Sequence, residues 1–251
     1  MSATALAGRT AFVAGATGPV GRAVVAALAA AGVRVGVHHR TGGAAAQELV
    51  EDLPGELVAV GADLTEPAAL DAAVRAVEDR FGPVGVLVNA AHPRPPAPAT
   101  VAATSAADLA DQLAGVQVHA ALLVRVVPGM RAQGFGRIVY VSGALMARPA
   151  PGHGAYGAAK AAASVLTRYT ALEEGCHGIT ANVVAPGRVV DPGLEEPLDP
   201  EQADLSRRLL ERMALPTFPT PQEVADVVLA LLASPAVTGQ TVWVAGGEPI
   251  A

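Results

Sequence analysis

The stretch VSGALMARPAPGHGAYGAAK (141–160) contains a tyrosine and a lysine four positions apart, Tyr156 and Lys160, and one serine, Ser142, upstream of them. A phenol with a pKa of about 10 is a poor base at neutral pH unless a nearby cation favours the phenolate. Residues four apart on a helix share a face, so Lys160 can supply that charge. The spacing predicts a proton-transfer pair; the alternative is a pair of helix-surface residues without a catalytic role.

Glycines recur at three-residue intervals in AGATGPVG (14–21), at Gly15, Gly18 and Gly21. Glycines at such positions permit a tight turn, let backbone N–H groups approach a pyrophosphate and allow a helix to pack closely on a strand. A Gly-rich turn alone is weak evidence. This one joins the first expected strand to the first expected helix, and that position predicts a dinucleotide site.

The second expected strand ends in HHR and carries no carboxylate. Folds that bind NAD usually place an acidic residue about 20 residues after the glycine loop to hold the ribose hydroxyls. Arg40 stands in that region, and a guanidinium suits the 2′-phosphate of NADP(H); a solvated surface arginine is the alternative. Asp63 is expected either to accept a hydrogen bond from the adenine amino group or to cap a helix.

Strand-like apolar runs alternate with helical patterns along the whole chain, which predicts a doubly wound (Rossmann) parallel α/β sheet in a single domain, 1–251. The Pro- and Glu-rich segment 191–220, with a helical piece near 201–213, is expected to cover the substrate, or else to be a surface loop. Strands are expected at 10–15, 33–38, 56–63, 84–90, 136–143, 178–187 and 241–246, and helices at 20–31, 43–52, 67–80, 105–132, 154–174 and 221–233.

Composition narrows the possible partners and location. Asp and Glu number 23 against 17 Lys and Arg, which argues against a nucleic-acid partner or an anionic membrane. The single cysteine, Cys176, fits a reducing cytosol, and neither a signal peptide nor an apolar run of membrane-spanning length is expected. We therefore expect a cytoplasmic protein without a metal site.

Several motifs together resemble the short-chain dehydrogenase/reductase family over essentially the whole chain: GATGPVG near residue 15, ADL (62–64), LVNAA (87–91), the Tyr156–Lys160 pair, NVVAPG (182–187) and TGQTVWVAGG (238–247). The resemblance implies a sheet of about seven strands that binds NAD(P) at the carboxyl ends of its strands, a small-molecule substrate, and a homotetramer or dimer. It also implies that the tyrosine is the general acid/base and that the lysine lowers its pKa and holds the nicotinamide ribose. The cofactor residues it implies are Gly15, Thr17, Gly18, Val20, Gly21, Arg40, Asp63, Leu64, Asn89, Ala91, Tyr156, Lys160, Pro186, Gly187 and Val189.

The sequence departs from the family pattern where a serine should orient the substrate carbonyl. That serine lies thirteen residues before the tyrosine, and here the position holds Gly143, with Ser142 one residue earlier. Adjacent side chains on an extended chain point to opposite faces, so Ser142 is expected to turn away unless a bulge returns it to the site. Ser142 is kept as the candidate catalytic serine.

Further departures affect the helix asparagine and a nicotinamide-side threonine of the family. The asparagine should fall near 115–117, which reads Gly115, Val116 and Gln117, and the place of the threonine holds Asp191. Substitute donors are expected at His92 and His153, each of which has a solvated loop histidine as its alternative. Other candidate cleft residues are Arg94, Arg148, Arg188, Asp191 and Glu195.

The leading hypothesis is an NADP(H)-dependent oxidoreductase of the ketoreductase or alcohol dehydrogenase type, with Tyr156 as general acid/base and Lys160 as its activator. One alternative is a non-redox enzyme on the same scaffold, such as a cyclase, a dehydratase or a relative of the halohydrin dehalogenases. Those dehalogenases resemble this family but carry Arg where Lys160 stands and have lost the Gly-rich loop. The other alternative is a cofactor-binding protein whose catalysis has decayed.

Overall fold

The computed structural model describes residues 6–191 and 200–248. In these residues the chain forms a seven-stranded sheet in the order β3-β2-β1-β4-β5-β6-β7, with every neighbouring pair of strands parallel. The doubly wound α/β fold predicted from the sequence is confirmed. The strands are β1 Thr10–Ala14, β2 Arg34–His39, β3 Leu57–Gly61, β4 Val84–Asn89, β5 Gly136–Val141, β6 Ile179–Pro186 and β7 Thr241–Val244.

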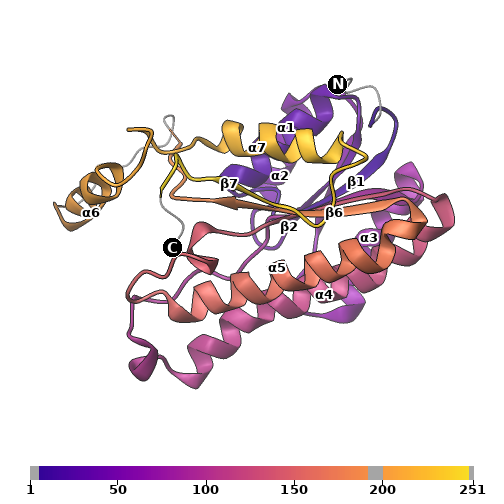
Figure 1. The fold of residues 1–251 in the computed structure, drawn as a ribbon. Coiled ribbons are helices and arrows are strands. Elements are labelled where there is room, and N and C mark those ends of the chain that lie inside the picture. Colours follow the sequence, from indigo (N-terminus) through magenta and orange to yellow (C-terminus); the bar gives the residue numbers. More distant parts are fainter. Residues whose placement is uncertain (1–5, 192–199, 249–251) are drawn as a thin grey trace.

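Helices cover both faces of the sheet. Figure 1 shows α1, α2 and α7 on one face and α3, α4 and α5 on the other. Alternation along a strand serves both layers: in β1, Ala11 and Val13 join one apolar cluster and Phe12 joins the other. The helices are α1 Pro19–Ala30, α2 Gly43–Asp52, α3 Pro67–Phe81, α4 Ala106–Gln133, α5 Gly154–Glu174, α6 Pro200–Leu210 and α7 Pro221–Leu232, with 3-10 turns η2 Val101–Ala103, η3 Ala144–Met146 and η4 Gly175–His177.

The strand order reverses direction between β1 and β4, which lie side by side at the middle of the sheet. Connections leave the carboxyl ends of these two strands toward opposite edges, so a crevice opens between them. In open parallel sheets, ligands bind in this crevice. The loops after β1, β4 and β5 therefore form the floor and walls of the site described below.

Local signals fix the ends of the helices that carry site residues. Ser105 caps α4 by accepting a hydrogen bond from the backbone N–H of Asp108 at 3.0 Å. Thr220 and Glu223 form a capping box at the start of α7. Gly134 ends α4 in the left-handed region, at φ +60°, which a glycine adopts without strain.

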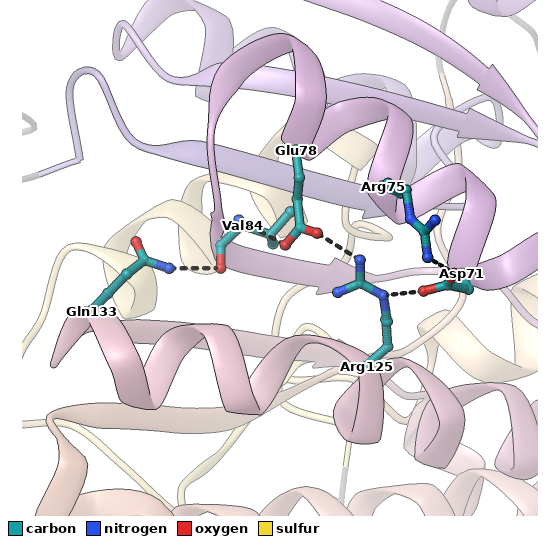
Figure 2. Close-up of polar contacts among 6 residues, drawn as sticks. All are labelled: Asp71, Arg75, Glu78, Val84, Arg125 and Gln133. Atoms are coloured by element: carbon teal, nitrogen blue, oxygen red, sulfur yellow. Dashed lines mark hydrogen bonds and ion pairs between the residues drawn. The ribbon is translucent and has the colours of Figure 1, made fainter.

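Polar side chains join α4 to α3, as Figure 2 shows. Arg125 donates from Nε to Asp71 at 2.7 Å and from Nη2 to Glu78 at 2.6 Å. At the last residue of α4, Gln133 Nε2 donates to the carbonyl of Val84 at the start of β4. These contacts set the position of α4 along the sheet, and hence of the site residues near its N-terminal end.

Helix α6 lies within the segment expected to cover the substrate, where it forms the predicted helical piece. In Figure 1 it stands apart from the two helical layers. The chain after α6 returns to the sheet: Leu215 N–H bonds Gly246 O at 2.9 Å, and Val190 N–H bonds Pro219 O at 3.0 Å. Glu195 and the rest of 192–199 lie outside the described residues.

Helix α4 is long and apolar enough to cross a membrane by length and composition, which the sequence analysis did not expect. The mean hydropathy of its most apolar window is 1.5, but 44% of that window is buried inside the protein. Leu122, Val126 and Met130 are almost fully buried in the cluster that α4 shares with the sheet. Packing against the sheet thus explains part of the apolar character of α4.

Candidate active site

Two adjoining hollows open at the carboxyl ends of β1 and β4. The Tyr156 hollow, of about 380 Å³, extends from the glycine loop to the start of α5, and the Arg40 hollow, of about 340 Å³, extends from the same loop to the ends of β2 and β3. They share Gly15, Gly18, Ala90, His92, Pro93 and Arg94. Of the predicted cofactor residues, the first is lined by Gly15, Gly18, Val20, Gly21, Tyr156, Lys160, Pro186, Gly187 and Val189, and the second by Gly15, Thr17, Gly18, Arg40, Asp63, Leu64 and Ala91.

Each glycine of the loop after β1 has its own structural role. Gly15 has φ +74°, and a Cβ there would lie 2.7 Å from the backbone nitrogen of Ala91. A Cβ on Gly21 would lie 2.1 Å from Gly15 O, so only glycine lets α1 pack on the turn. Gly18 is the N-cap of α1 and provides no side-chain cap. The first N–H groups of α1 therefore suit an anion in the hollow.

His38, which the sequence analysis missed, holds this loop in place through a hydrogen bond. His38 Nδ1 accepts a hydrogen bond from the Gly15 N–H at 3.2 Å, and Nε2 lies 3.1 Å from Ala62 O. A carbonyl only accepts, so Nε2 carries the proton and the imidazole is neutral. Burial lowers the pKa of His38, consistent with that state. In the sequence, His38 could have been singled out because it lies at the end of a predicted buried strand.

At the Arg40 hollow, Arg40 is exposed and Asp63 forms the turn after β3. Asp63 Oδ1 accepts hydrogen bonds from Thr65 N–H at 3.0 Å and Thr65 Oγ1 at 2.7 Å, and these bonds lower the pKa of the carboxyl. The N-cap of α3 is Glu66, so the expected alternative of a helix-capping role for Asp63 is not met.

Asn89 lies beneath the hollows and does not line either of them. Its Oδ1 accepts from the Ala91 N–H at 3.0 Å, which fixes the loop after β4. Its Nδ2 donates to His119 Nδ1 at 3.1 Å, so His119 Nε2 donates to Thr167 Oγ1 at 2.9 Å. This fully buried chain joins β4, α4 and α5, and burial lowers the pKa of His119 to about 3. The predicted contact of Asn89 with cofactor stays a prediction.

Tyr156 and Lys160 reach the same hollow from one face of α5. Lys160 Nζ donates to Val141 O at 2.9 Å and lies 5.7 Å from the centre of the Tyr156 ring. Burial lowers the pKa of Lys160 to about 7 and raises that of Tyr156. Burial of the phenol is the cause of the raised pKa of Tyr156, and the expected lowering of that pKa by Lys160 stays a prediction.

Ser142 is among the residues that line the Tyr156 hollow, but its hydroxyl lies in the contact between β5 and α5. Its Oγ lies 2.9 Å from Ser164 Oγ and 3.4 Å from Lys160 O. The next residue, Gly143, faces the tyrosine: a Cβ built there lies 2.9 Å from Tyr156 Oη. The one-residue offset seen in the sequence therefore has the expected geometric result, and the catalytic role of Ser142 stays a prediction.

The region expected to hold an asparagine presents glycine to the site. Gly115 lines the Arg40 hollow, while Gln117 is exposed on the outer side of α4. Gln112, one turn earlier and fully buried, was missed by the sequence analysis. Its Oε1 accepts a hydrogen bond from His92 Nε2 at 3.1 Å, so the tautomer that fits is His92 protonated on Nε2. Burial and the charge of Lys160 lower the pKa of His92 to about 3.

The remaining candidates are spread around the hollows. His153 Nδ1 lies 3.1 Å from Pro151 O, and Arg94 lines both hollows. Arg148 forms a buried ion pair with Glu248 at 2.5 Å, and the Arg188 guanidinium lies 5.4 Å from the centre of the Phe218 ring. Asp191 is half-buried at the end of the first described segment. Among the described residues there is no group of three His, Cys, Asp or Glu that could hold a metal ion.

A parallel sheet with a glycine-rich turn after β1 and a Tyr–Lys pair over the same crevice defines a dinucleotide-binding α/β protein with a site for proton transfer. Comparison with known proteins gives the family. Residues 15–248 match the family described as enoyl-(acyl carrier protein) reductase. The chain belongs to the short-chain dehydrogenase/reductase family, whose members are oxidoreductases that use nicotinamide cofactors.

Individual relatives match over nearly the full chain. L-xylulose reductase of Bos taurus is 37% identical over 96% of this chain and 97% of its own. The 3-oxoacyl-[acyl-carrier-protein] reductase of Synechocystis sp. is 31% identical over 97% and 98%. The structure of a short-chain type dehydrogenase/reductase from Mycobacterium ulcerans aligns with a TM-score of 0.89 at 26% identity, covering 97% of this chain and 90% of that one.

Proposed function

We propose that the protein is an NADP(H)-dependent reductase of small carbonyl compounds, with Tyr156 as the proton donor. The observation that carries the proposal is the single crevice in which the uncapped N-terminus of α1 and the Tyr156–Lys160 pair line one hollow. Relatives with the names L-xylulose reductase and 3-oxoacyl-[acyl-carrier-protein] reductase support the same reaction class.

The residues around the crevice fit a dinucleotide. The free N–H groups of α1 suit the pyrophosphate, and the Arg40 hollow suits the adenosine half. Arg40 would pair with the 2′-phosphate, because no carboxylate stands beside it at the end of β2 to repel that group. Lys160 would exchange its bond to Val141 O for a ribose hydroxyl. Bound NADPH would supply the hydride that reduces the substrate carbon.

The protonated phenol of Tyr156 suits the role of proton donor. Burial raises the pKa of the phenol, so it carries its proton at neutral pH. Reduction needs this proton for the carbonyl oxygen, and the proton is lost only as the pH rises through the raised pKa. Lys160 would then donate a hydrogen bond to the bound cofactor and keep it in place in the hollow.

The wall beside Tyr156 suggests a predominantly apolar substrate. Pro93, Pro95 and Val189 line the Tyr156 hollow, and Ala97 and Ala155 line a small recess next to the same tyrosine. The segment 191–220 would extend this wall, in line with a substrate-covering role. We place the enzyme in the cytoplasm on the strength of its composition.

Self-association would use the outer face of α4 and α5. Val124 on α4 is 76% exposed, and on α5 Tyr169 is 59% and Leu172 is 81% exposed. Large apolar residues gathered on adjacent helices are typical of protein–protein contacts. This face is the one that we propose to be covered in a homodimer or homotetramer.

A second function, that of a cofactor-binding protein with decayed catalysis, is favoured by one observation. The Ser142 hydroxyl accepts a hydrogen bond from Ser164 Oγ and donates to Met146 Sδ at 3.1 Å, so its proton is directed away from Tyr156. Incubating the purified chain with NADPH and a panel of aldehydes, ketones and vicinal diketones separates the possibilities. Loss of NADPH absorbance with formation of alcohol supports reduction. Binding of NADPH without turnover supports decayed catalysis, and halide release from halohydrins without cofactor supports a dehalogenase-like reaction.

A further inference from the structure

Gly115 on α4 leaves a space that the ring of His92 fills. A Cβ built on Gly115 would lie 2.5 Å from His92 Nδ1 and 2.9 Å from Cε1. Carbon atoms in proteins do not approach a neighbour so closely, so the ring and a side chain at position 115 exclude each other. The glycine therefore fixes where the loop after β4 can lie against α4.

The ring is held in this space by a buried glutamine. Gln112 Oε1 accepts from His92 Nε2 at 3.1 Å, and Gln112 Nε2 donates to Arg94 O at 2.8 Å. With the proton on Nε2, Nδ1 is a bare acceptor, and among the described residues this buried atom has no hydrogen-bond partner. An unpartnered buried acceptor costs stability.

The opposite side of the ring contacts the proposed proton donor. His92 and Tyr156 pack edge to face, with centroids 5.2 Å apart and planes at 87°. On its other side, the phenol oxygen lies against Gly143, where a Cβ would be 2.9 Å away. Between these two neighbours the phenol ring has little freedom to move. Displacing His92 would therefore release Tyr156.

We infer that His92, seated on Gly115, is the positioning residue that holds the Tyr156 phenol for proton transfer. The inference rests on the proposed function only because it names proton transfer as the step that becomes slower when His92 is displaced. The packing exchange between positions 92 and 115 can be tested without any substrate. Near-attack geometry is demanding, since a displacement of about 1 Å can cost roughly 10²-fold in rate.

A double-mutant cycle of Gly115→Ala and His92→Ala tests the inference. In the wild-type background, Gly115→Ala places a methyl group on the His92 ring, so it should lower both the melting temperature and kcat, the latter by at least about tenfold. In the His92→Ala background the same change should raise the melting temperature, because alanine is the better helix former. Gly129→Ala is the matched control: it lies in the same helix with open space around it, and should keep the wild-type kcat.

Alkaline ultraviolet titration of the phenols gives a readout independent of activity. Burial raises the pKa of Tyr156, so both His92→Ala and Gly115→Ala should lower that pKa toward its usual value by opening the site to water. Subtracting the titration of Tyr156→Phe assigns the change to this tyrosine. The inference is supported if the Tyr156 pKa falls and kcat, measured at saturating NADPH, drops in both variants.

Two results would overturn it. Additive effects of the two substitutions on melting temperature would show that the ring and the position-115 side chain do not exclude each other. Coupling in stability with an unchanged Tyr156 pKa and an unchanged kcat would show a packing role alone. A wild-type chain that binds NADPH but reduces no carbonyl would overturn the proposed function and the positioning role together, while leaving the coupling in melting temperature to be observed.

Discussion

At the scale of single residues, cofactor choice depends on Arg40. The guanidinium is exposed at the mouth of the hollow, with His39 and Thr41 as its neighbours in the lining. A charge-assisted hydrogen bond contributes about 1.5–3 kcal/mol, so the 2′-phosphate should add at least about tenfold in affinity. Arg40→Ala should lose this preference for NADPH over NADH, measured as dissociation constants by fluorescence titration. Arg75→Ala, on the exposed side of α3, is the control and should keep it.

Gly143 decides how much room the phenol of Tyr156 has. Its φ of −169° is extended backbone that any residue adopts, so a side chain is resisted only by Tyr156 Oη, 2.9 Å from the Cβ. Gly143→Ala should slow reduction by displacing the phenol. Gly143→Ser should be faster than Gly143→Ala, because its hydroxyl adds a donor of a kind worth about 10²-fold or more in kcat elsewhere.

Ser142→Ala is the companion test in steady-state rates of ketone reduction. The Ser142 hydroxyl is bonded to Ser164 and near Lys160 O, so its removal should cost about 1 kcal/mol of stability and leave kcat almost unchanged. Loss of activity in Ser142→Ala, with no difference between Ser and Ala at position 143, would show that Ser142 acts on the substrate in the working enzyme.

At the scale of elements, the buried chain from Asn89 through His119 to Thr167 ties β4 to both long helices and makes the fold sensitive to acid. The unfolded chain protonates His119 near its usual pKa of 6.5, whereas the folded chain holds the pKa at about 3. Between these values the unfolded state binds more protons, so stability falls as the pH drops from 6.5 to 3, by up to roughly 5 kcal/mol.

Urea unfolding at pH 7.0 and pH 4.5 measures this loss. His119→Gln can keep both hydrogen bonds without a titrating group, so its free energy of unfolding should change less between the two pH values than that of the wild type. His177→Gln, at an exposed position in η4, should behave as the wild type. An equal loss in wild type and His119→Gln would assign the acid sensitivity to other groups.

The sequence predicted the elements well because their signals are local. The strands and helices fall within a few residues of their expected bounds, and β3 ends two residues early because Asp63 and Thr65 form a turn. The glycine loop and the Tyr156–Lys160 pair were found from spacing alone. His38, Gln112 and His119 were missed because their roles depend on contacts between elements distant in the chain. The raised pKa of Tyr156 likewise follows from burial, which spacing does not report.

At the scale of the whole molecule, the exposed apolar face of α4 and α5 predicts association. Leu172→Glu should shift the protein toward smaller species in size-exclusion chromatography with light scattering, because a charge there would be buried in the interface. Val101→Glu, at a similarly exposed position in η2, is the control and should leave the mass unchanged. A wild-type monomer at all concentrations would contradict the proposed interface.

The fold brings the glycine loop, Arg40 and Tyr156 to one crevice although they lie far apart in the chain, and the central claim is that this crevice reduces carbonyls with NADPH. The most direct measurement follows deuterium into product by mass spectrometry, from NADPH that carries deuterium at both C4 positions, with matched reactions of wild type and Tyr156→Phe. The wild type should give alcohol deuterated at the former carbonyl carbon. Tyr156→Phe should bind NADPH equally well and form that product at least about 10²-fold more slowly. Equal rates in the two proteins, or NADPH bound without deuterium transfer to any carbonyl, would contradict the account.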